Sequence, residues 1–182
     1  MNTSPTLHKD ELIKESEKAF HRFTTFCKSM PEDQFFRMPA DGDWSAAQHL
    51  QHLVVSVKTT TAAYALPKFL VRWIGGRPNR PSHTFPELVA GYKQKLAEGI
   101  KLKGRYLPRP AKPGTHKDDY INNWRQFTTI YLQALKKNWP DEKLDHYIVK
   151  HPVLGKITLR ELCYFTIYNT DHHLKAIENL QF

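Results

Sequence analysis

Cysteine is scarce in this chain of 182 residues. The two cysteines, Cys27 and Cys163, lie far apart and inside helical patterns. A disulfide framework or a cysteine-based metal site needs several cysteines at characteristic spacings, so neither class is supported. We therefore expect two reduced thiols in the core of a cytosolic protein.

Long apolar runs are also lacking. The longest candidate, residues 64–74, contains Pro67, Lys68 and Arg72, whereas a transmembrane helix needs about 20 mainly apolar residues. Residues 1–10 have no apolar region typical of a secretion signal. The sequence predicts no membrane association, no secretion and a cytoplasmic location.

The signatures of several functional classes are missing. We find no His-Glu-x-x-His motif, no Glu-x-x-His ligand pair, no glycine-rich phosphate loop and no Gly-x-Ser-x-Gly turn. The net charge is +9, but no recognition helix, zinc finger or aromatic-basic strand accompanies it. Nucleic-acid binding is therefore not favoured.

Apolar residues at helical spacing, by contrast, are abundant. They make up 40% of the chain, enough for the core of one domain covering residues 1–182. Their three-four spacing, with flanking prolines and capping residues, predicts long helices over residues 7–29, 45–66, 118–138 and 158–180. Ser45 with Gln48, and Thr158 with Glu161, form two capping boxes.

The connections complete the predicted fold. Residues 75–86 are rich in proline and glycine, residues 86–101 have helical spacing, and residues 105–114 contain three prolines and should form an extended loop. A brief strand is expected at Tyr147–Val149, with a turn at Gly155. The prediction is an all-α four-helix bundle with a long crossover, containing an extra short helix, between helices two and three. No alternation of β-branched runs with helices suggests a parallel sheet.

Much of the positive charge lies in this crossover. Residues 93–117 hold eight lysines and arginines and one acid, Glu98. A solvated charged loop is one interpretation. The other is an anion-binding rim for a small molecule, formed by Lys101, Lys103, Arg105 and Arg109.

The last predicted helix has a stripe that is polar in its middle: Leu159, Leu162, Thr166, Asn169, His173, Ala176 and Leu180. Buried polar groups are costly unless something satisfies them. Asn169 and His173 are four residues apart, so both can face one metal, water molecule or helix. The second helix carries His49 and His52, and His52 lies beside small residues that leave room for a pocket. Asp171 and His172 are expected at the surface, and Trp44 in the core or at the start of helix two.

Two segments resemble the DinB/YfiT-like superfamily. The run from Trp44 through Ser45 to His52 and Leu53 is similar to its helix-two signature, and residues 152–177 resemble its fourth helix with the preceding turn. This resemblance implies a four-helix bundle, commonly a homodimer, with a divalent metal bound by three histidines. Characterised members include transferases and isomerases that use low-molecular-weight thiols.

Carried over by position, the resemblance makes His52 and His173 metal ligands and puts Asn169 at the third ligand position. An amide oxygen is a poor ligand for Zn²⁺ or Ni²⁺, so the predicted site is weakened. His49, one turn from His52, is the best replacement ligand.

Two hypotheses follow. In the first, the protein is a metal-dependent transferase or hydrolase that acts on a small, anionic or thiol-linked molecule. In the second, it is a metal-free bundle that serves as a binding or interaction module. There Asn169 and His173 bond to each other or to His52 and set the helix register.

Overall fold

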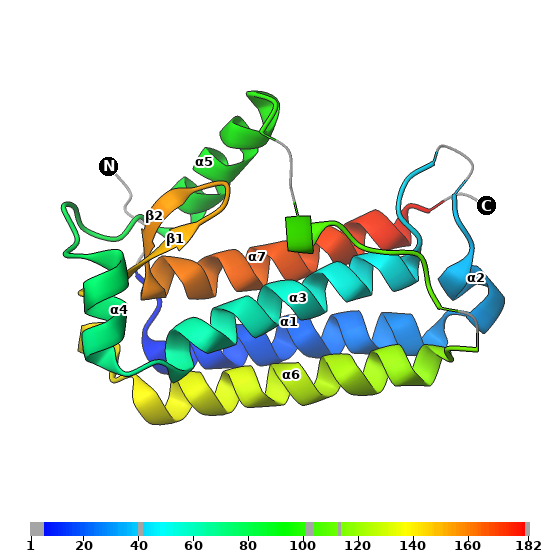
Figure 1. The fold of residues 1–182 in the computed structure, drawn as a ribbon, viewed down its shortest axis with the longest axis horizontal. Coiled ribbons are helices and arrows are strands. Elements are labelled where there is room, and N and C mark those ends of the chain that lie inside the picture. Colours follow the sequence, from blue (N-terminus) through cyan, green and yellow to red (C-terminus); the bar gives the residue numbers. More distant parts are fainter. Residues whose placement is uncertain (1–5, 40–41, 101–103, 113, 181–182) are drawn as a thin grey trace.

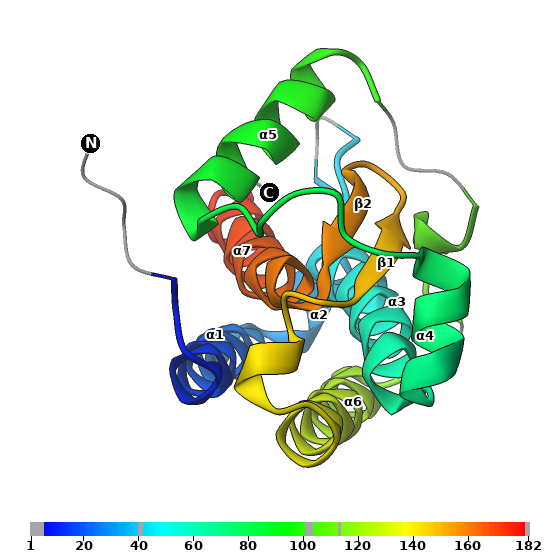
Figure 2. The same cartoon turned by 90° about the vertical axis from the view of Figure 1, so that its left-hand side faces the viewer.

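Four long helices lie side by side in the computed structural model, which describes residues 6–39, 42–100, 104–112 and 114–180 (Figure 1). They are α1 (Lys9–Ser29), α3 (Ala46–Ala65), α6 (Lys117–Asn138) and α7 (Leu159–Glu178). Seen from the end, they surround one core, with α1 and α3 each beside both α6 and α7 (Figure 2). The predicted all-α bundle is confirmed.

The core forms where the apolar stripes meet. Phe20 of α1 makes edge-on contacts with Trp124 and Tyr131 of α6, with ring centroids 5.3 and 5.5 Å apart. Cys27 and Cys163 are buried free thiols, as predicted. Burial raises the pKa of Cys27 to about 12 and that of Cys163 to about 11, so neither is a reactive thiolate.

Both predicted capping boxes are present. Ser45 Oγ accepts from the Gln48 amide at 3.3 Å, and the Ser45 amide donates to Gln48 Oε1 at 2.9 Å. Thr158 and Glu161 repeat this exchange at 3.2 and 2.7 Å. Because these bonds satisfy the first amides of each helix, they fix where α3 and α7 begin.

Several shorter helices connect the four long helices of the bundle. The predicted crossover helix is α5 (Phe85–Ala97), which ends before Gly99, where φ is +82°. Two helices were not predicted, α2 (Glu32–Phe36) and α4 (Lys68–Gly75). The expected extended loop at residues 105–114 instead begins within a 3₁₀ turn, η1 (Gly104–Tyr106).

A hairpin precedes α7. Strand β1 (Ile148–His151) pairs antiparallel with β2 (Gly155–Thr158), with Ile148 opposite Thr158 and His151 opposite Gly155. The expected strand and turn are therefore present, and β2 is an additional strand. A second 3₁₀ turn, η2 (Asp141–Lys143), follows α6.

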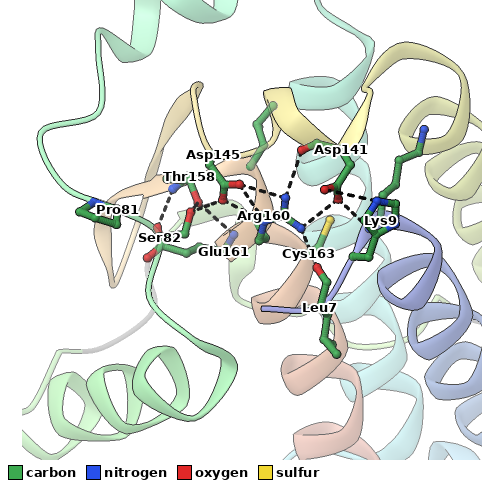
Figure 3. Close-up of polar contacts among 12 residues, drawn as sticks. Leu7, Lys9, Pro81, Ser82, Asp141, Asp145, Thr158, Arg160, Glu161 and Cys163 are labelled. Carbon is green, nitrogen blue, oxygen red and sulfur yellow. Dashed lines mark hydrogen bonds and ion pairs between the residues drawn. The ribbon is translucent and has the colours of Figure 1, made fainter. Parts of the chain in front are cut away.

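A buried polar network holds the start of α7 to other segments (Figure 3). Arg160, 3% exposed, donates to Asp145 at 2.8 Å and to the carbonyl oxygen of Leu7 at 2.6 Å. Ser82 donates to the same Asp145 carboxylate at 2.5 Å. The network thereby joins the segment before α1, the crossover and α7.

Within the described ranges, no helix combines the length and apolar character needed to cross a bilayer.

Candidate functional site

Histidines from α3 and α7 meet inside the bundle. The ring centroid of His173 lies 4.6 Å from that of His52 and 5.0 Å from that of His49. All three side chains are buried, with exposed fractions of 4 to 8%. The two predicted faces therefore converge.

Trp44 covers this cluster. Its ring is parallel to that of His173, with centroids 6.1 Å apart, and lies 5.4 Å from both His49 and His52. The residue directly precedes the Ser45 cap, so the capping box also fixes the position of the indole. Sequence analysis had assigned Trp44 only to the core or to the start of the helix.

The crossover determines the tautomer of His52. Its Nδ1 lies 2.7 Å from the carbonyl oxygen of Tyr106 in η1. A carbonyl can only accept, so Nδ1 carries the proton and the neutral ring presents a free lone pair at Nε2. Burial lowers the pKa of His52, although the bond to Tyr106 opposes this shift. No sequence pattern pointed to Tyr106.

His49 is bonded to His173. Their Nδ1 atoms are 2.7 Å apart, so the N–H of one ring donates a hydrogen bond to the Nδ1 of the other. Burial lowers the pKa of His49 to about 4 and that of His173 well below its usual value, so both rings are neutral near pH 7. When His173 is the donor, its Nε2 is free. Only the donating ring has a free Nε2 lone pair, so either His173 or His49, but not both, can present a nitrogen to a metal while the two neutral rings stay bonded. The role of His49 as a replacement ligand therefore stays a prediction.

Asn169 has an unsatisfied oxygen. The side chain is 1% exposed, and no hydrogen-bond partner for Oδ1 exists among the described residues. A buried acceptor without a partner costs about 1–3 kcal/mol. A ligand, a water molecule or an ion bound at this point would remove that cost.

A cavity of about 130 Å³ adjoins both His52 and Asn169. It lies between α3, α5, α7, η1 and the hairpin, and its walls are largely apolar and aromatic. The lining residues are His52, Ser56, Thr59, Thr60, Ala63, Tyr92, Tyr106, Val149, Lys150, His151, Pro152, Val153, Leu162, Phe165 and Asn169. His49 and His173 are not among the lining residues, although both contact His52 or its neighbours in the cluster. An apolar cavity with a few convergent polar groups is typical of small-molecule sites.

His151 is a cavity residue that sequence analysis missed. Its Nδ1 accepts from the amides of Val153 and Leu154 at 3.2 and 3.1 Å. In the neutral ring the proton is therefore on Nε2. Burial lowers the pKa of His151 to about 4, which keeps the ring neutral near pH 7. The residue lies in a short strand without a motif, so no local signal identified it.

The predicted metal ligands are His52, His173 and Asn169. The described residues include no group of three or more His, Cys, Asp or Glu side chains that could hold an ion. The predicted set differs from such a group: it has two imidazoles, His52 and His173, and the unsatisfied amide oxygen of Asn169. With one imidazole fewer than three, the affinity for Zn²⁺ or Ni²⁺ should be reduced.

The other predicted residues lie outside the cavity. Asp171 pairs with Arg22 at 2.7 Å, and His172 is exposed. Arg105 and Arg109 are exposed and do not line the cavity, while Lys101 and Lys103 lie outside the described residues. The cation in the lining is Lys150, from β1.

Comparison with known protein families matches residues 15–177 to the DinB superfamily. No curated protein and no solved structure gives a match. The matched range contains α3, all but the last residue of α7, both capping boxes, the cavity and the histidine cluster. This chain belongs to the DinB superfamily.

Proposed function

We propose that the protein binds a small molecule in the cavity and acts on it as a metal-dependent transferase or hydrolase. One observation carries the proposal. The free Nε2 of His52 and the unsatisfied oxygen of Asn169 belong to the lining of the same cavity. Two acceptor atoms that have no partner among the described residues, beside an apolar cavity, favour a bound ligand over a purely structural cluster.

His52, His173 and Asn169 would hold the ion. A divalent metal there would polarise the substrate or lower the pKa of a water molecule or thiol. The carbonyl of Tyr106 keeps the proton of His52 on Nδ1, and Trp44 shields the cluster from solvent. Lys150 in the lining can attract an anionic or thiolate-bearing molecule, and the Nε2–H of His151 can orient its polar end.

A metal-free binding module is the second candidate. It is favoured by the short bond between His49 and His173, which engages both Nδ1 atoms inside the protein. In this case the same cavity binds its ligand through Asn169 and His151 alone. The homodimer and the cytoplasmic location stay predictions.

Metal analysis separates the two candidates. Untagged protein is incubated with Zn²⁺, Ni²⁺ or Mn²⁺, desalted and analysed by mass spectrometry for its metal content. One equivalent that is lost in His52→Ala but retained in the exposed control His172→Ala supports the metal-dependent function. Binding well below one equivalent with all three ions favours the metal-free module.

A gain-of-affinity variant tests the role of Asn169. Asn169→His supplies the missing imidazole and should tighten Zn²⁺ or Ni²⁺ binding by at least about tenfold, since even indirect partners of metal ligands change affinity by about 10–100-fold. Calorimetric titration measures the change. An unchanged affinity would show that this side chain does not reach the ion.

A further inference from the structure

Helix α4 lies at one end of the bundle (Figures 1 and 2). It carries large apolar side chains that are exposed. Phe69 is 71% exposed, Trp73 82% and Ile74 64%. On the opposite side of the helix, Val71 and Gly75 are buried. One side of α4 therefore packs on the bundle. The other side forms an exposed apolar crest made of Phe69, Trp73 and Ile74. Exposed apolar patches on a protein surface commonly mark a site of interaction.

This crest is held in a fixed position. A Cβ atom added at Gly75 would lie 1.8 Å from the carbonyl oxygen of Ile148, so α4 and β1 are in close contact. The guanidinium of Arg72 lies 4.5 Å from the ring centroid of Tyr147. Gly75 packs against Ile148 and Arg72 packs against Tyr147, so two contacts hold α4 against β1 and the residue before it. The exposed apolar side chains therefore belong to a helix with a fixed position.

A cationic pocket lies beside the crest. It has a volume of about 570 Å³ and is lined by Arg72, Arg77, Pro78, Arg80, Pro81, Asp145 and His146. The carboxylate of Asp145 is bonded to Arg160, and Arg80 is paired with Glu161 at 2.7 Å. Arg77 is exposed, and no ion-pair partner for it occurs in the described part of the chain. The pocket consequently keeps unneutralised positive charge.

We propose that α4 and this pocket, which includes Arg77, dock on an anionic phospholipid surface. Phe69, Trp73 and Ile74 would enter the interfacial layer, while lipid phosphates meet the arginines. Bilayer interfaces favour tryptophan and attract clustered lysine and arginine. The net charge of +9 acts in the same direction.

A second copy of the chain fits this surface less well. A two-fold contact places the same patch on both partners. Both copies would have to bury the same arginines, while the nearby carboxylates, Asp145 and Glu161, are already engaged by Arg160 and Arg80. The proposal concerns contact with a membrane surface, not a spanning helix, so it departs from the sequence-based expectation of no membrane association. It is independent of the metal site.

Vesicle binding tests the proposal on the full chain. Vesicles of phosphatidylcholine alone are compared with vesicles that also contain phosphatidylglycerol, by co-sedimentation and tryptophan fluorescence. Trp73 is 82% exposed, whereas Trp124 and Trp139 are at most 1% exposed and Trp44 is half-buried against the histidine cluster. Trp73 should therefore contribute most to a blue shift on binding, and the shift that is lost in Trp73→Ser measures its share. We expect binding and a blue shift only with the anionic vesicles, and both should weaken as salt is raised.

Two variants and their matched controls identify the surface. The double variant Phe69→Ser with Trp73→Ser, and separately Arg77→Glu, should each reduce vesicle partitioning at least about tenfold. Met38→Ser removes another exposed apolar side chain, and Arg125→Glu makes the same charge change on α6. Both controls should bind vesicles as the unmodified protein does.

Three results would overturn the proposal. The first is no binding to anionic vesicles, or equal loss in the variants and their controls. The second is self-association that Trp73→Ser abolishes, measured by light scattering without vesicles, in a protein that does not bind vesicles. The third is Arg77-dependent binding of inorganic phosphate alone, which would indicate a soluble anion as the ligand.

Discussion

Asn169 sets the balance between stability and ligand binding at the scale of single residues. Its buried oxygen has no hydrogen-bond partner in the described part of the chain, and the residue occupies the position where the family pattern has a third histidine. A protein selected only for stability would have little reason to keep this group. Its retention beside His52 and a cavity is the reason for treating the arrangement as a binding site.

Replacing Asn169 with leucine should stabilise the ligand-free protein. Asn169→Leu removes the unsatisfied acceptor at similar volume, so the free energy of unfolding should rise by about 1–3 kcal/mol. Urea denaturation at neutral pH measures the change. In the control Asn138→Leu, the amide that donates to the carbonyl of Tyr64 at 3.1 Å is lost, and stability should fall by about 1 kcal/mol. A loss of stability in Asn169→Leu would indicate that a bound water already satisfies the oxygen.

Sequence reasoning reached only part of the site. His52, His173 and Asn169 were found because helical spacing places them on two facing stripes. Tyr106 and His151 were missed because each reaches the cavity from a segment whose path is set by long-range contacts. A 3₁₀ turn and a four-residue strand have no periodicity that would show which way their side chains point.

At the scale of elements, the helices that the sequence predicts are the longer ones with side-chain caps. Helices α3 and α7 are 20 residues long and begin at capping boxes, so their pattern was clear. Helix α4 has eight residues, little more than two turns, and begins after Pro67 without a side-chain cap. Its position depends on the contact with β1, which no local pattern reveals.

The contact at Gly75 gives a paired prediction. Gly75→Ala places a methyl group against the carbonyl of Ile148, so α4 must shift, and the free energy of unfolding should fall by about 1–3 kcal/mol. The control is Gly91→Ala in α5, where nothing lies within 4 Å of the added Cβ. Since alanine favours helix, this control should gain about 0.5–1 kcal/mol. Equal effects at the two positions, measured by thermal unfolding, would show that α4 is not held as described.

At the scale of the whole molecule, the bundle followed from apolar periodicity and the crossover from its prolines. Periodicity does not predict the hydrogen bonds and ion pairs that join segments far apart in the sequence. Arg160 is on a buried side of α7 and reaches Leu7 and Asp145, and such partners are fixed only when the chain has folded. The same long-range burial leaves several histidines neutral inside the protein.

These buried histidines make stability depend on pH. Burial lowers the pKa of His49 and His151 to about 4 and also lowers those of His52 and His173. In the unfolded chain the histidine pKa is about 6.5. As pH falls below that value the unfolded state takes up protons first, so the free energy of unfolding should be nearly constant between about pH 7 and pH 8 and decrease towards pH 4.

His151→Asn tests how much of this dependence comes from one ring. The asparagine oxygen can replace Nδ1 as acceptor for the amides of Val153 and Leu154, but it does not titrate. The slope of unfolding free energy against pH between 4 and 6.5 should therefore fall by up to about 1.4 kcal/mol per pH unit, the contribution of one proton.

The control is His146→Asn, at an exposed position, which should leave the slope unchanged. The lowered pKa values of Glu161 and Asp141 also cause acid destabilisation, but only below about pH 4.5, where carboxylates protonate. A slope that is the same in the unmodified protein and in His151→Asn would mean that His151 is protonated in the folded state, and its neutral role in the cavity would have to be abandoned.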